Sequence, residues 1–129
     1  AILEGTAYGI RQNMDIVEKD LGFSIDAFHT VGGGSKSGIW SQIKSDVTNK
    51  VVHTMNIKET AVLGAAMLGG IAAGVYKDYK DSVTQAAASS LQTYNPRSQF
   101  YPLYSHMFEE YKGLYVDVKE RFQRLHQLL

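Results

Sequence analysis

The chain has 129 residues, of which 44% are hydrophobic and 20% charged, and its thirteen basic residues balance thirteen acidic ones. This length suits one compact domain or part of one. The balanced charge gives no electrostatic footprint for nucleic acid or for an anionic membrane surface, so neither is an expected partner. The absence of cysteine excludes disulfide scaffolds and thiolate metal sites, and it fits a cytoplasmic protein.

The sequence opens at Ala1 directly into an apolar helical pattern, with no basic leader and no cleavage site, so no signal peptide is expected. It reads as a piece of a longer protein. The most apolar stretch, residues 61–76, is shorter than the roughly 20 residues that cross a bilayer, and it contains several glycines. We therefore expect no transmembrane segment.

The first half of the chain alternates predicted helices and strands. Apolar residues recur every three or four positions from Leu3 to Leu21, which predicts a helix over about residues 2–20 that stops at Gly22. Alternating apolar residues predict a strand over 23–31. After a glycine turn, Ser35 or Ser37 can cap a helix that runs to about Thr48, with a buried side marked by Ile39, Ile43 and Val47. Residues 51–55 predict a second strand, and residues 59–74 a helix of small residues.

The second half is predicted to be mostly helical. Residues 78–81 read as a polar connection, 83–90 as a weaker helix, and 94–102, with both prolines, as an irregular loop. The last helix is predicted over about residues 103–128. Its aromatic and apolar stripe favours a core face over a base-stacking platform, because no basic groove accompanies it. An exposed stripe would instead predict self-association. The stripe consists of Tyr104, Phe108, Tyr111, Tyr115, Val118, Phe122, Leu125 and Leu129.

Strand, helix and strand over this length predict a parallel pair with a right-handed crossover, in an α/β fold. Two parallel strands alone do not form a stable sheet. We therefore expect the sheet to be completed by sequence outside this chain or by another copy, so a homo-oligomer is a candidate arrangement.

The run from Val31 to Gly38 (VGGGSKSG) lies between the first strand and the next helix. Its three glycines allow a tight turn and close ligand approach, and the free N–H groups of the following helix favour an anion or polar ligand. The spacing is not that of a Walker A loop, a dinucleotide fingerprint or a nucleophile elbow. Taken alone, the run fits a plain capped turn as well as it fits a ligand site. Asp46, late in the helix, favours a structural role, and the four histidines lack metal-ligand spacing, so no metal site is expected.

An ordered set of motifs resembles the C-terminal signature of the FGGY carbohydrate kinases, in the xylulose kinase and gluconate kinase branch. It extends over nearly the whole chain, from the first helix with Arg11 to the closing helix after Pro102. The central motifs are Gly32-Gly33-Gly34-Ser35-Lys36-Ser37, Trp40, Gln42-Ile43, Asp46-Val47, Val51-Val52, Glu59 to Ala66 and Gly74-Val75-Tyr76.

The resemblance implies part of a ribonuclease H-like domain of the actin, hexokinase and Hsp70 type, helix-rich with at least two parallel strands. Residues 1–129 would be one partial domain, the nucleotide-binding part, without the N-terminal sugar-binding domain. It implies that Gly32, Gly33, Gly34 and Ser37 lie against ATP, with Ser37 near the adenine. ATP and Mg²⁺ would serve the whole enzyme, and the catalytic Asp would belong to the N-terminal half.

Three interpretations follow from this pattern. The first is the ATP-binding part of a kinase that phosphorylates a hydroxyl of a sugar or sugar acid, inactive by itself. The second is a non-enzymatic ATP-binding or assembly module of the same superfamily. The third is a small α/β interaction domain whose glycine turn binds no ligand.

Overall fold

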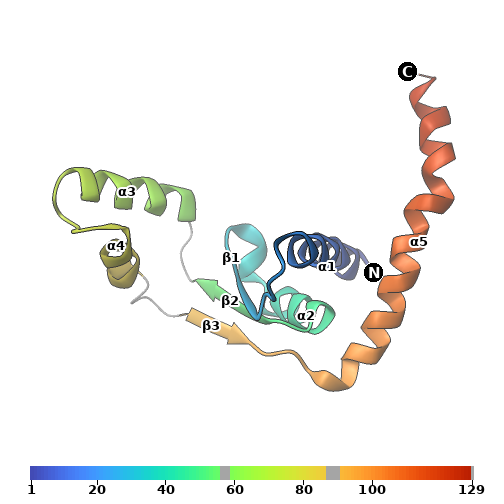
Figure 1. Cartoon of the computed structure of the whole chain (residues 1–129), viewed down its shortest axis with the longest axis horizontal. Helices are drawn as coiled ribbons and strands as arrows, with labels where there is room; N and C mark the ends of the chain where they lie inside the picture. Colours follow the sequence, from blue (N-terminus) through green and yellow to red (C-terminus); the bar gives the residue numbers. More distant parts are fainter. Residues whose placement is uncertain (56–58, 87–90, 129) are drawn as a thin grey trace.

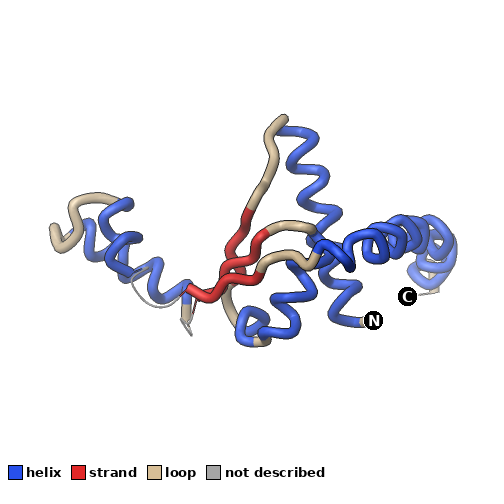
Figure 2. Tube along the Cα trace, turned by 90° about the horizontal axis from the view of Figure 1, so that it is seen from below, coloured by secondary structure: helices blue, strands red, loops and turns tan. Residues whose placement is uncertain are grey.

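The computed structural model of the chain describes residues 1–55, 59–86 and 91–128. A three-stranded sheet lies at the centre, with α1 and α2 beside it, the α3–α4 pair at one end and α5 at the other (Figures 1 and 2). The elements in chain order are α1 (Ile2–Leu21), β1 (Ala27–Thr30), η1 (Gly33–Lys36), α2 (Gly38–Thr48), β2 (Val51–Met55), α3 (Thr60–Ala72), α4 (Tyr79–Ala86), β3 (Leu91–Tyr94), η2 (Ser98–Phe100) and α5 (Tyr101–His126).

The sheet has the strand order β1-β2-β3. β1 pairs with β2 in parallel, with Phe28 opposite Val52, which confirms the predicted parallel pair. β1 is shorter than the predicted 23–31 strand. β3 pairs antiparallel with β2, with Tyr94 opposite Val52, and was not predicted. Four residues beside a proline-containing loop carry little strand signal of their own, so pairing with β2 is what makes them a strand.

Local signals set the ends of the first helices. α1 ends where Gly22 takes the left-handed conformation, with φ 68°, and donates its N–H to the Glu18 carbonyl. Ser37 caps the start of α2, where its side chain accepts a hydrogen bond from the Trp40 N–H, and Asn49, with φ 55°, caps its end. Both helices confirm the prediction, because their caps are encoded by single residues at each end.

The core lies where α1, α2 and α5 meet. Ala7, Tyr8, Val47 and Phe108 are buried together, and Ile43, Tyr104 and Tyr111 pack against them. The prediction for Ile39 is wrong: its side chain is 75% exposed, because it lies in the first turn of α2, away from this core. The first half of the α5 stripe is core, as predicted.

The second half of that stripe is exposed, so the prediction of a core face fails there. Tyr115 is 64%, Phe122 57% and Leu125 56% exposed. The C-terminal part of α5 runs away from the rest of the molecule (Figure 1), which leaves Phe122 and Leu125 without a neighbouring element.

The α3–α4 pair differs in two respects from the prediction. α4 begins at Tyr79, so residues 79–81 are helical instead of a connection; the predicted end of that helix, 87–90, lies outside the described residues. α3 is apolar on all sides, yet Val62 and Leu68 are exposed and only Met67 is buried. An added Cβ at Gly64 or Gly69 would meet no atom within 4 Å, whereas one at Gly70 would lie 2.6 Å from the Tyr76 ring.

Candidate functional site

The glycine turn leaves the carboxyl end of β1 and enters α2 through η1. Gly32 has φ 80°, a conformation that L side chains rarely adopt. The Gly32 carbonyl accepts hydrogen bonds from the Ser35 N–H at 3.2 Å and from the Ser35 hydroxyl at 2.7 Å. Ser35 is buried. The turn is therefore held in shape by its own residues and needs no ligand to form.

Ser37 caps the helix that follows. Its hydroxyl oxygen accepts from the Trp40 N–H at 3.3 Å, and its carbonyl accepts from the Ser41 N–H at 2.9 Å. The four predicted contact residues, Gly32 to Gly34 and Ser37, are thus brought into one turn at the N-terminus of α2. In an open α/β sheet, ligands bind beside the carboxyl ends of the strands, which is where this turn lies.

The free space beside the turn is unequal. An added Cβ at Gly33 would meet no atom within 4 Å, whereas one at Gly34 would lie 2.6 Å from Cζ3 of Trp40. The Trp40 ring thus covers the side of Gly34 on which a side chain would stand. Gly32, like Gly33, has no atom within 4 Å of the position of an added Cβ, so Gly34 is the covered glycine of the three.

Sequence reasoning missed Lys44, which lies next to this turn. Its side chain is 5% exposed, and its ammonium nitrogen lies 4.2 Å from the centre of the Trp40 ring. Burial lowers the pKa of the Lys44 ammonium. The sequence could have indicated this contact, because Trp40 and Lys44 are four residues apart and therefore lie on one face of α2.

Asp46 has the structural role that its helix position predicted. Its carboxylate is fully buried and accepts hydrogen bonds from three nitrogens of Arg97: the backbone N–H at 2.8 Å, Nε at 3.1 Å and Nη2 at 2.6 Å. It therefore anchors the segment before α5 to α2 and is not placed to act as a base.

Two histidines that are far apart in the sequence are neighbours in the sheet. His29 and His53 are paired across β1 and β2, with ring centres 5.1 Å apart. Within the described ranges, no group of three or more His, Cys, Asp or Glu side chains could hold a metal ion. In the same ranges, no helix is long and apolar enough to cross a membrane.

Comparison with known proteins places this geometry in a family. Residues 1–73 match the C-terminal domain of the FGGY family of carbohydrate kinases. The chain is 26% identical over 120 residues to the xylulose kinase of Bacillus subtilis, covering 93% of this chain and 24% of that protein. It is 32% identical over 117 residues to the autoinducer-2 kinase of Klebsiella pneumoniae, covering 91% of this chain and 22% of that protein.

A solved structure extends the match to the fold. The ligand-bound xylulose kinase of Lactobacillus acidophilus superposes with a TM-score of 0.78 and 19% identity, over 97% of this chain and 25% of that one. The chain therefore spans about a quarter of the length of these relatives. Its fold is part of the actin and hexokinase type of ATPase domain, as predicted. The matching residues and the superposed fold agree: the chain belongs to the FGGY family of carbohydrate kinases, to whose C-terminal domain its first 73 residues correspond.

Proposed function

We propose that residues 1–129 form one partial domain, the ATP-binding C-terminal part of a cytoplasmic kinase. The whole enzyme would transfer the γ-phosphoryl group of ATP to a hydroxyl of a sugar or sugar acid. Relatives named xylulose kinase, autoinducer-2 kinase and ribulokinase support a small polyhydroxylated substrate without selecting one.

The observation that carries this proposal is the open backbone at Gly33, at the carboxyl end of β1 and the N-terminus of α2. Free N–H groups at a helix N-terminus favour an anion or a polar ligand. Nothing within 4 Å fills the side-chain position of Gly33, so the backbone there has room beside it for a ligand. In this proposal Gly32, Gly33 and Gly34 contribute backbone to the nucleotide site, and Ser37 lies near the adenine. Trp40 covers Gly34, so the nucleotide would approach the backbone at Gly32 and Gly33.

The chemical step requires groups that we assign to an N-terminal half. The only fully buried carboxylate near the turn, within the described ranges, is Asp46. Its Oδ2 accepts from the Arg97 guanidinium, and its Oδ1 accepts from the Arg97 backbone N–H and from Gln42 Nε2. We assign the base that accepts the sugar hydroxyl proton, and the sugar pocket, to that half. Mg²⁺ would be held by the ATP phosphates and by residues outside this chain. The chain by itself is then expected to bind ATP weakly and to transfer no phosphoryl group.

ATP binding tests the site directly. We expect Gly33→Leu to weaken ATP binding by about tenfold or more, equivalent to about 1.4 kcal/mol, because the new side chain takes the open space. Isothermal titration of the chain with ATP measures this. Gly5→Leu is the matched control, since Gly5 also has open space around it but lies on α1. Equal affinity of the Gly33→Leu variant and the unchanged chain would remove the nucleotide site from this turn.

Phosphoryl transfer separates the kinase from the non-enzymatic alternative. The chain joined to its own N-terminal half should phosphorylate at least one member of a panel of sugars and sugar acids, and the chain alone none. ATP binding without transfer to any of them, in the joined protein, would favour the nucleotide-binding assembly module instead.

A further inference from the structure

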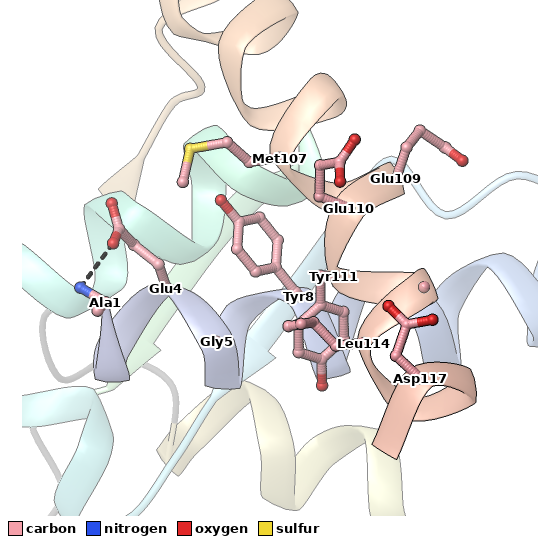
Figure 3. A pocket seen from close by; sticks show the side chains of 11 residues that line it. Ala1, Glu4, Gly5, Tyr8, Met107, Glu109, Glu110, Tyr111, Leu114 and Asp117 are labelled. Carbon is pink, nitrogen blue, oxygen red and sulfur yellow. Dashed lines mark ion pairs between the residues drawn. The ribbon is translucent and has the colours of Figure 1, made fainter. Parts of the chain in front are cut away.

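The hollow between α1 and α5 (Figure 3) holds polar groups that do not act together. Its four carboxylates, from Glu4, Glu109, Glu110 and Asp117, do not converge on one point. The Tyr8 hydroxyl beside it is buried and unpaired among the described residues, so a ligand in the hollow does not reach it. Another buried polar group, the Lys44 ammonium, lies next to the glycine turn and therefore next to the proposed nucleotide site.

Lys44 is a buried charge without a counter-charge. It is 5% exposed, and within the described ranges it forms no ion pair. Burial alone lowers the pKa of its ammonium, so among these residues no carboxylate offsets the loss of water. Taking a charge out of water costs stability unless another interaction compensates it. A methionine would pack at this position without that cost, so the presence of an ammonium calls for a physical reason.

The Trp40 ring takes the place of a counter-charge. The Lys44 ammonium nitrogen lies 4.2 Å from the centre of the ring. Helical side chains point towards the N-terminus of their helix, so Lys44 reaches back one turn, towards Trp40 and the glycine turn. An indole face attracts a desolvated ammonium more strongly than an exposed one. The ring's own N–H contributes nothing to its orientation, because Trp40 Nε1 is buried without a hydrogen-bond partner in the described part of the chain.

The ring, fixed in this way, lies against the third glycine of the turn. Three carbons of its six-membered ring are 2.6, 3.2 and 3.3 Å from the position of an added Cβ at Gly34. At the other end of the turn, Ser35 donates two hydrogen bonds to the Gly32 carbonyl. Consecutive glycines have more backbone freedom than any other residues. The ring and the hydrogen bonds together restrain that freedom before any ligand arrives.

We propose that Lys44 is a positioning residue of the nucleotide site. Its ammonium holds the Trp40 ring over Gly34, and the ring keeps the turn in the shape that ATP meets. This inference rests on the proposed function, in which Gly32 and Gly33 present their backbone to the nucleotide. A turn that is ordered in advance does not have to be ordered by the ligand, so the nucleotide binds more tightly.

Removing the charge should move stability and ATP binding in opposite directions. Lys44→Met keeps a long, unbranched side chain and removes the buried ammonium, so the urea midpoint should stay equal or rise. ATP affinity, measured by isothermal titration, should fall about fivefold, because the turn loses its restraint. Acrylamide quenching of Trp40, the single tryptophan of the chain, should increase as the ring is released. Unchanged affinity, or a loss of affinity together with a lower urea midpoint, overturns the positioning role.

A double-mutant cycle separates action through the ring from direct attraction of the anionic ATP. In a Trp40→Leu background, Lys44→Met should cause no further loss of affinity, because the ring is no longer there to be held. A further loss of about fivefold would mean that the ammonium acts on ATP directly, which contradicts the inference. If Trp40→Leu does not fold, Trp40→Phe replaces it, and the loss should then shrink, because phenylalanine attracts a cation less than tryptophan does.

Lys19→Met is the matched control, since it removes an exposed positive charge from α1, away from the turn. It should leave both ATP affinity and Trp40 quenching unchanged. An equal loss of affinity in this control would show that total charge, and not the position of Lys44, sets ATP binding.

The Gly33→Leu variant distinguishes this inference from the proposed function. If Gly33→Leu weakens ATP binding and Lys44→Met does not, the nucleotide site stands and the role of Lys44 fails. If Gly33→Leu binds ATP as tightly as the unchanged chain, the nucleotide site fails, and this inference with it. Acrylamide quenching tests the hold of Lys44 on the Trp40 ring without any nucleotide, and equal quenching of Lys44→Met and the unchanged chain overturns that first step.

Discussion

Gly34 lies against the half-buried ring of Trp40, over which the Lys44 ammonium is stacked. An added methyl group at Gly34 would be 2.6 Å from Trp40 Cζ3, and this stacked ring cannot move aside as the end of a flexible side chain could. We expect Gly34→Ala to lower the free energy of unfolding by about 1–3 kcal/mol, the usual cost of overpacking. Urea denaturation followed by Trp40 fluorescence measures it.

Gly33, next to Gly34 in the turn, provides the control for this prediction. Gly33→Ala adds the same methyl group where no atom lies within 4 Å, so its free energy of unfolding should stay within about 0.5 kcal/mol of the unchanged chain. Similar losses in both variants would mean that backbone conformation, and not the Trp40 contact, selects glycine in this turn.

Three elements are joined by the Glu18 carboxylate near the end of α1. Its Oε1 accepts from Lys50 Nζ at 2.9 Å, before β2, and from the Ile25 N–H at 2.6 Å, before β1. The Lys50 hydrogen bond and then the Ile25 N–H lower the pKa of Glu18 below its ordinary value of 4.5. A carboxyl group with a lowered folded-state pKa stabilises the fold above its unfolded pKa and loses that contribution as the pH falls through the folded value.

We therefore expect the melting temperature to fall on acidification below about pH 4.5, and Glu18→Gln to flatten that dependence. Thermal melts between pH 3 and pH 7, with about one-unit steps, would show it. Glu120→Gln, on the exposed side of α5, should keep the acid sensitivity of the unchanged chain. An equally steep curve for the Glu18 variant would show that this contact does not couple α1 to the sheet.

For the whole molecule, the exposed half of the α5 stripe predicts self-association. Tyr115, Phe122 and Leu125 are each more than half exposed on one helix that leaves the body of the molecule (Figure 1). Contiguous exposed apolar surface favours association. We expect the sedimentation coefficient to rise with concentration, and Phe122→Glu to weaken that association by about tenfold, because it places a charge in the stripe.

Gln123→Glu serves as the comparison, because it adds the same charge at the adjacent exposed position, beside the stripe. It should leave the association almost unchanged. A chain that remains monomeric at all concentrations, or two variants that behave alike, would exclude the stripe as an association surface.

Much of the fold could be predicted where a signal is local. The ends of α1 and α2 follow from Gly22 and Ser37, each of which caps through a backbone or side-chain contact within four residues. β2 was predicted from its run of β-branched residues. The structural role of Asp46 followed from its position in α2. These features depend on neighbours along the chain, so a single sequence is enough to identify them.

Features that depend on distant neighbours escaped prediction. β3 is a strand only because β2 offers it an edge. His29 and His53 meet because the parallel register places them side by side. Ile39 satisfies the helical pattern but lies one turn beyond the core, so periodicity alone misplaced it. The covering of Gly34 by Trp40 also required the backbone path of the turn.

By itself the sequence determined the helix caps from single residues, the parallel strand pair from the order strand, helix, strand, and the family from the order of its short motifs. Only the tertiary structure decided which half of α5 is buried and which glycine of the turn is covered. Burial and open space are set by elements far apart in the sequence, and the hydrophobic pattern of one element does not say what packs against it.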